Sequence, residues 1–229
     1  MGREFTKNMF IMLLAIMIGV ILITFFASDI MKRMELQQQQ EQYQAEIEII
    51  ETEKIIIEEM SKNFTDHFFK SLGYLDLSRE YRADGNTNFD FAASIWYPQK
   101  EYDLVIENCS QAMEKLFTAY ENFLESKTFF ADIEEFTTDE KYLSIINLYV
   151  DLCDAGANVS MLRYNASYYL KDIATKLRDF GESANVSELL VLYNTTIALY
   201  QGALGQYEAI IDEIEEEFGK FFNPIRETP

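Results

Sequence analysis

Residues 186–218 read VSELLVLYNTTIALYQGALGQYEAIIDEIEEEF, and their apolar side chains recur every three or four positions. This spacing places the apolar side chains on one stripe of an α-helix whose opposite face is polar. The stripe consists of Val186, Leu190, Tyr193, Ile197, Tyr200, Leu204, Tyr207, Ile211, Ile214 and Phe218. We therefore expect an amphipathic helix from Ser183 to Phe218 that ends before Pro224.

Two earlier segments show the same periodicity. One runs from Gln99 to about Phe136, and the other runs from Thr137 to Phe180. Thr137 followed by Glu140 matches a capping box that would begin the second segment, and Gly181 would end it. Long helices joined by such short links must fold back antiparallel, which predicts an all-α helical bundle of about four long helices.

The fourth helix is expected from the N-terminal part of the chain. Residues 9–27 read MFIMLLAIMIGVILITFFA, nineteen residues without a charge that would span roughly 28 Å as a helix. Bulky phenylalanines occupy the positions where signal peptidase requires small residues, so we predict an uncleaved transmembrane signal anchor; a cleaved signal peptide and a buried helix of a soluble protein are the alternatives. The predicted fold class is all-α, an N-terminal transmembrane helix that continues into an extracytoplasmic antiparallel bundle.

These observations predict five regions along the chain. They are a short cytoplasmic N-terminus (1–8), the transmembrane anchor (9–27), a membrane-proximal helical stalk (28–62), the bundle ectodomain (63–222) and a C-terminal tail (223–229).

The stalk carries a partial coiled-coil pattern. Apolar residues recur at intervals of seven, and they are Leu36, Tyr43, Ile50, Ile57 and Phe64. The companion column is less apolar, and it consists of Gln40, Ile47, Lys54, Ser61 and Phe68. A stable coiled coil needs both columns to be apolar. We therefore favour packing within the chain's own bundle, with self-association through the stalk, or binding of a protein partner, as the alternatives.

Residues 82–90 contain the turn-forming residues Gly, Asn and Asp, so we expect the first helix to end there and a brief helix to follow from Phe89 to Tyr97. Oxygen ligands alternate in this segment as the first ligands of a calcium loop do, at Asp84, Asn86, Asn88 and Asp90. The calcium-loop pattern then fails, because Phe89 occupies the glycine position and Ile95 the glutamate position. A turn rich in Asn and Asp is the favoured interpretation, and calcium is the only cofactor left as an alternative.

Six sequons of the form N-x-S/T predict N-glycosylation, and their asparagines are Asn63, Asn108, Asn158, Asn165, Asn185 and Asn194. Chance placement of the Asn, Ser and Thr residues present would give far fewer. Sequons are modified on the translocated side of a membrane. We therefore expect a single-pass membrane protein with its N-terminus inside and its C-terminal domain outside the cytoplasm.

Outside the cytosol, a disulfide between Cys109 and Cys153 would be chemically allowed. In an antiparallel helix pair the two residues would lie roughly 18 Å apart along the axis, whereas bridged Cα atoms lie within about 7 Å. Buried thiols are therefore favoured, with the disulfide as the alternative.

The composition argues against several function classes. A net charge of −20 repels phosphate, so we expect no nucleic acid partner. His67 is the only histidine, so a di-metal bundle that needs two Glu-x-x-His motifs is excluded, and no Ser-His-Asp or Cys-His arrangement can be assigned. We predict no catalytic residues and no enzymatic activity.

Residues 95–113 read IWYPQKEYDLVIENCSQAM, and they resemble the middle of one tetratricopeptide repeat. Tyr102, Asp103, Ile106 and the pair Ala112-Met113 match the repeat, whereas Lys100 and Val105 replace its turn glycine and packing alanine. The chain shows no second copy at a 34-residue period, and solenoids need about three repeats. The resemblance implies one helix-turn-helix unit.

The function that these expectations favour is a glycosylated helical ectodomain on a membrane anchor that acts as a protein-interaction or scaffold module, or as an accessory subunit of an envelope complex. The alternative is a sensor-like ectodomain that binds a small ligand, because helical bundles on membrane anchors resemble the input domains of chemoreceptors.

Overall fold

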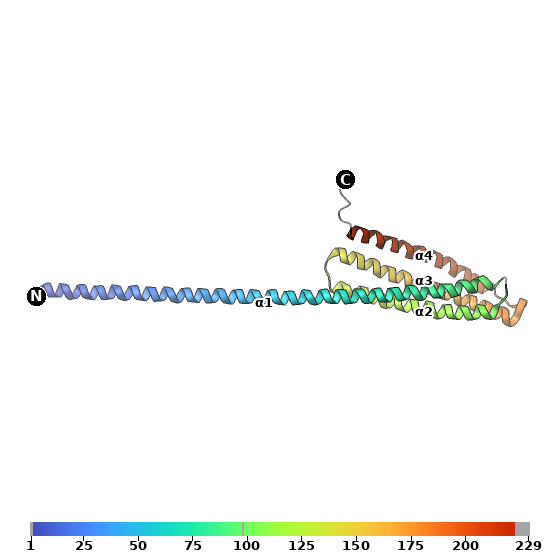
Figure 1. The fold of residues 1–229 in the computed structure, drawn as a ribbon, viewed down its shortest axis with the longest axis horizontal. Helices are drawn as coiled ribbons and strands as arrows, with labels where there is room; N and C mark the ends of the chain where they lie inside the picture. Colours follow the sequence, from blue (N-terminus) through green and yellow to red (C-terminus); the bar gives the residue numbers. More distant parts are fainter. Residues whose placement is uncertain (1, 98, 223–229) are drawn as a thin grey trace, which may run out of the picture. The chain divides into compact units, whose positions relative to one another are not determined.

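A computed structural model describes the backbone of residues 2–97 and 99–222 and, from residue 31 on, most of their side chains. These residues form four α-helices, α1 (Gly2–Ile95), α2 (Tyr102–Asp132), α3 (Glu140–Phe180) and α4 (Ser187–Phe222), with short 3-10 turns at Ile133–Glu135 and Gly181–Ser183. The described part of the chain is therefore helical apart from its short connections, as Figure 1 shows. The predicted C-terminal tail, residues 223–229, lies outside the described residues.

The chain divides into two compact units, residues 1–59 and residues 60–229. The first unit consists of α1 up to residue 59, and the second contains the rest of α1 together with α2, α3 and α4. In the second unit α2 packs against α3, and α3 packs against α4. The helical bundle predicted from the apolar periodicity is therefore confirmed.

The predicted fold class is wrong in its transmembrane helix. Within the described residues, none of the helices combines the length and the apolar character needed to cross a membrane. From residue 31 to residue 59, α1 carries charged residues in most of its turns, and charges in contact with lipid are costly. Most side chains of the predicted anchor, residues 9–27, lie outside the described residues.

The predicted break of the first helix at residues 82–90 is also wrong, because α1 continues to Ile95. A Cβ atom at Gly85 would lie 2.6 Å from Cγ of Leu116 and 3.3 Å from the carbonyl oxygen of Ala112. Gly85 therefore allows α1 and α2 to approach closely, rather than making a turn. Phe89 and Ala92, both buried, continue the same face of α1.

Local sequence accounts for the ends of α3. The side chain of Asp139 accepts a hydrogen bond from the backbone N–H of Lys141 (2.9 Å), so Asp139 is the N-cap in place of the predicted Thr137. Thr137 instead accepts from the N–H of Asp139 (3.2 Å). At the other end Gly181 has φ = 59°, a conformation that favours glycine, and it ends α3 as predicted.

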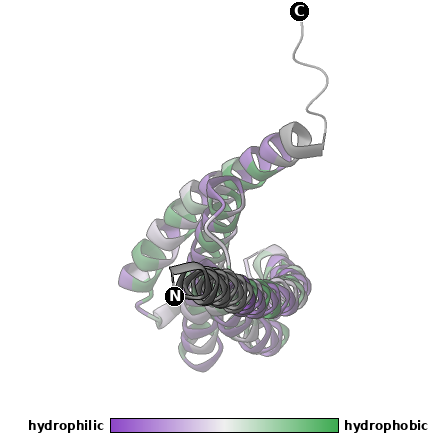
Figure 2. Ribbon diagram, turned by 90° about the vertical axis from the view of Figure 1, so that its left-hand side faces the viewer, coloured by the Kyte–Doolittle hydropathy of each residue, from purple (hydrophilic) through white to green (hydrophobic). Residues whose placement is uncertain are grey.

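The interior of the second unit consists of two hydrophobic clusters. One is built largely from aromatic and branched side chains, including Phe123, Phe130 and Tyr207. The other is rich in alanine and contains Ala112, Ala166 and other small residues. Figure 2 shows hydrophobic and hydrophilic residues sharing the helices of the bundle, as expected for amphipathic helices packed around a core.

Candidate functional site

A row of exposed apolar side chains lies on α1 within the first unit. We call this row the α1 seam; its members are Leu36, Tyr43, Ile47, Ile50 and Ile57. Their exposed fractions range from 54 % for Ile47 to 65 % for Tyr43 and Ile57. At 100° per residue all five fall within about 80° of the helix circumference, so they form one narrow stripe. These five side chains are exposed within the first unit.

Glutamates border the α1 seam on both edges. Helical geometry places Glu46 and Glu53 along one edge and Glu51 and Glu58 along the other, and all four are exposed. Lys54 lies in the stripe itself, with its Nζ atom 3.7 Å from Oε1 of Glu58. Both partners are exposed, so this ion pair adds little stability. The seam is thus an apolar strip between two acidic edges.

The opposite side of α1 provides an internal reference surface. Ile49 and Ile56 lie about 120° and about 140° around the helix from the seam centre, and they are 58 % and 50 % exposed. Two isoleucines separated by one heptad do not form a continuous stripe. Ile49 and Ile56 therefore provide control positions for experiments on the seam.

A second feature, inside the bundle, is a cluster of arginines and aromatic rings, which we call the arginine–aromatic cluster. The guanidinium carbon of Arg82 lies 4.2 Å from the ring centre of Tyr207. The guanidinium carbon of Arg163 lies 4.0 Å from the ring of Phe89 and 4.4 Å from that of Tyr200. Cation–π contacts of this kind are worth about 0.5–2 kcal/mol each, depending on desolvation. The cluster connects α1, α3 and α4.

Hydrogen bonding in the arginine–aromatic cluster is incomplete. Arg163 forms an ion pair with Asp90, and Nε of Arg79 donates to the hydroxyl of Tyr207 (3.4 Å). Buried atoms that find no hydrogen-bond partner within the described part of the chain are Nη1 of Arg82, Nε of Arg163 and Oδ1 of Asn86. Buried polar atoms are normally satisfied, so the two arginine N–H donors are available to a bound water or an anion, and Oδ1 of Asn86 is available to a donor such as water.

An open groove adjoins Arg79. Its volume is about 350 Å³, and its lining consists of Arg79, Tyr149, Leu152, Ile211, Ile214 and Glu215. The lining is mainly apolar, with one cationic and one anionic side chain. A groove of this size could accept a small organic molecule.

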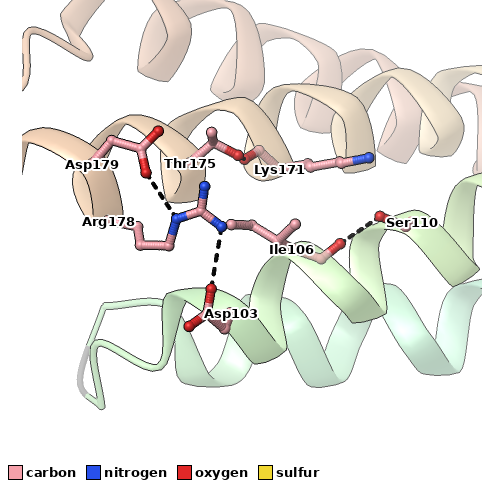
Figure 3. Close-up of polar contacts among 7 residues, drawn as sticks. All are labelled: Asp103, Ile106, Ser110, Lys171, Thr175, Arg178 and Asp179. Atoms are coloured by element: carbon pink, nitrogen blue, oxygen red, sulfur yellow. Dashed lines mark hydrogen bonds and ion pairs between the residues drawn. The ribbon is translucent and has the colours of Figure 1, made fainter.

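At the end of the bundle near the α1–α2 connection, Arg178 links α2 to α3 (Figure 3). Its Nη1 lies 3.2 Å from Oδ1 of Asp103 on α2, and its Nε donates to Oδ1 of Asp179 (2.9 Å). Figure 3 also shows Ser110 bonded to the carbonyl oxygen of Ile106 within α2. These contacts link the ends of α2 and α3, and because they are exposed they add little stability.

The structure places the four predicted calcium ligands on α1 rather than on a loop. Asp84 and Asn88 lie on one face of the helix and Asn86 and Asp90 on another, so the four oxygens do not converge. Asp90 is engaged with Arg163. Across the described residues, no group of three or more His, Cys, Asp and Glu side chains is arranged to hold a metal ion.

Cys109 and Cys153 are free and buried. They belong to different hydrophobic clusters, Cys153 with Phe123 and Cys109 with Leu116. Burial raises the pKa of Cys109 to about 12. Burial also raises the pKa of Cys153 to about 11, although its hydrogen bond to Ser126 (3.3 Å) opposes the shift.

We expect both thiols to resist alkylation in the folded chain. Only the thiolate reacts, and pKa values 3 and 2 units above the ordinary 9.0 reduce its population at pH 8 about 1000-fold for Cys109 and 100-fold for Cys153. Iodoacetamide at pH 8, followed by mass spectrometry, should modify neither residue in the native chain and both after denaturation. Rapid native modification of either thiol would contradict its burial.

The sequon asparagines differ in accessibility. Asn63, Asn158, Asn185 and Asn194 are exposed, whereas Asn108 and Asn165 are half-buried. The side-chain amide of Asn108 also donates to the carbonyl oxygen of Leu104 (2.8 Å). Modification of the six sites stays a prediction.

Sequence reasoning missed the acidic edges of the seam and the arginine–aromatic cluster. The edges were detectable, because Glu46, Glu53, Glu51 and Glu58 keep a spacing of seven beside the seam columns. The arginine–aromatic cluster was not predicted because a turn was expected at residues 82–90, whereas Arg82 and Phe89 lie there on α1.

Comparisons of this chain with protein-family models, with curated proteins and with solved structures give no match. The case for a function therefore rests on the features described above. The tetratricopeptide resemblance of residues 95–113 stays a prediction; in the structure these residues form the end of α1, a short connection and the first part of α2.

Proposed function

We propose that this protein is an interaction module, in which a helical bundle carries an exposed helix that binds a protein partner through the α1 seam. The observation that carries the proposal is the row of five large apolar side chains that the chain itself leaves more than half exposed. Continuous exposed apolar strips with polar borders are typical of protein-binding surfaces.

The energetics of the seam support this role. Fully burying a large apolar side chain contributes about 1.5–3 kcal/mol, so covering the exposed parts of five of them is worth roughly 6 kcal/mol before the costs of association. A narrow stripe on a helix is the surface that a second helix covers most efficiently. The module could thus act as a scaffold or as an accessory subunit of a larger assembly.

Site-specific photo-crosslinking in the native cells tests the proposal. A benzophenone side chain at position 50, in the α1 seam, should give an adduct larger than the 26.7 kDa chain. The same group at position 56, on the opposite side of α1, should give little or none. Equal yields at the two positions, or no adduct at either, would remove the support for a binding role of the seam.

A small-ligand sensor is the second candidate function. It is supported by the groove beside Arg79, whose mainly apolar lining and single guanidinium favour an apolar molecule that carries a carboxylate. A thermal-shift screen with organic acids and amino acids separates the two functions, because a ligand that binds the folded state raises the melting temperature. The interaction module requires no such shift.

A further inference from the structure

The α1 seam has the dimensions of a coiled-coil contact. Leu36, Tyr43, Ile50 and Ile57 repeat every seven residues, and Ile47 adds a member of the second column. The stripe covers about 80° of the helix, which is narrower than the apolar face of a helix packed in a globular core. This inference rests on the proposed function, and it concerns the chemistry of the partner.

The acidic edges disfavour a second copy of this chain as the occupant. In a parallel pair of identical helices, Glu46 would face Glu51 of the second copy, and Glu53 would face Glu58. In an antiparallel pair each edge meets the same edge of the other helix, so glutamates again oppose glutamates. Both orientations therefore place like charges along the contact, which destabilises it.

Lys54 adds to this argument. It is 73 % exposed and lies in the stripe between Ile50 and Ile57. In a parallel pair of identical chains it would face a second Lys54 across the seam, where the two charges would be partly desolvated. An acidic residue on a different helix would instead pair with it.

We infer that the α1 seam binds a basic amphipathic helix of another protein, with Lys or Arg beside its apolar columns and one acidic residue opposite Lys54. Each basic flank would face a glutamate of the seam, so both edges of the contact would carry opposite charges. Residues 41–59 contain seven glutamates and one lysine, which also favours the approach of a basic helix.

Three synthetic peptides of four heptads provide the test. They share Leu and Ile seam columns and one Glu opposite Lys54, and they differ only in having Lys, Gln or Glu at the flanking positions. Fluorescence anisotropy measures binding to the full chain. The chain is kept in a nonionic detergent because residues 9–27 carry no charge and are largely apolar. We expect the Lys peptide to bind at least about tenfold more tightly than the Gln peptide, and the Glu peptide most weakly. The affinity for the Lys peptide should fall as salt is raised.

Matched variants distinguish the seam from general attraction to an acidic chain. The double variant Glu46→Lys/Glu53→Lys should bind the Lys peptide at least about tenfold more weakly and should gain affinity for the Glu peptide. The control Glu48→Lys/Glu59→Lys changes the net charge equally, but these residues lie outside the seam edges, so it should retain tight binding. Ile50→Gln should weaken binding, whereas Ile56→Gln should not.

Sedimentation of the full chain completes the design. If the full chain forms a dimer and the substitution Ile50→Gln dissociates it, the inference is overturned and the interaction function stands. A crosslink from position 50 to a second copy of the chain would have the same two consequences. Equal binding of the three peptides, or equal effects of the seam and control charge variants, would also overturn the inference. A monomer that neither binds the peptides nor crosslinks at position 50 would overturn both.

Discussion

Replacing Phe123 with alanine is expected to lower the free energy of unfolding by about 4 kcal/mol, the largest effect of any substitution considered for this chain. Phe123 is fully buried on α2, and its ring meets that of Tyr207 on α4 edge to face, with 6.3 Å between the centroids. It also lies directly over Gly156 on α3. Removing the ring therefore opens a cavity at the point where three helices meet.

Chemical denaturation of the full chain, followed by circular dichroism, measures this loss. The control is Leu124→Ala, because Leu124 follows Phe123 on the same helix but is 37 % exposed. Leu124→Ala should lower the free energy of unfolding by about 1 kcal/mol or less, since little cavity forms at the surface. Similar losses for the two variants would mean that Phe123 does not occupy the centre of the bundle.

The periodicity of the sequence predicted the three helices that follow residue 99. Their expected ranges, Gln99 to Phe136, Thr137 to Phe180 and Ser183 to Phe218, correspond to α2, α3 and α4 with shifts of a few residues. The shifts arise at the ends of the helices, and at α3 a capping side chain marks the first residue. At α3 two neighbouring residues, Thr137 and Asp139, could each serve as N-cap, and only the structure shows that Asp139 does.

The turn predicted at residues 82–90 is wrong because the turn preference of single residues does not include the packing of α1 against other helices. Gly, Asn and Asp favour turns in isolation, but here the buried face of α1 passes through them with a spacing of three or four. The relevant positions are Leu75, Ser78, Gly85, Phe89 and Ala92, all buried, with the half-buried Arg82 between Ser78 and Gly85. The close contact of Gly85 with Leu116 depends on α2, more than twenty residues later in the chain, and no local pattern reveals it.

The α1 seam was visible in the sequence, but its environment was not. The spacing of seven is unbroken from Leu36 to Phe68, yet the residues at its two ends differ in burial. Phe64 and Phe68 pack against the core of the second unit, whereas Ile50 and Ile57 are 63 % and 65 % exposed. Amphipathic periodicity shows which side chains share a face, and it does not show whether the chain itself covers that face.

Replacing Gly156 with alanine is expected to lower the free energy of unfolding by about 1–2 kcal/mol, although alanine is the better helix former by about 1 kcal/mol. A Cβ atom at Gly156 would lie 2.4 Å from Cε1 and 2.5 Å from Cζ of Phe123. That ring is fully buried, so it cannot move aside without disturbing its neighbours. In contrast, Gly73→Ala on α1 meets no atom within 4 Å and should raise the free energy of unfolding by up to about 1 kcal/mol.

A double-mutant cycle shows whether the ring of Phe123 is the cause. In a chain that already carries Phe123→Ala, the added methyl group of Gly156→Ala enters the vacated space, so only the gain in helix propensity remains. Gly156→Ala should then be neutral or stabilising, which corresponds to a coupling of about 2 kcal/mol between the two positions. Gly73→Ala should have the same effect in both backgrounds, because it does not contact Phe123. The contrary result is that Gly156→Ala lowers the free energy of unfolding equally with Phe123 present and with Phe123 replaced by alanine. That result would show that the contact between Gly156 and the Phe123 ring does not cause the destabilisation.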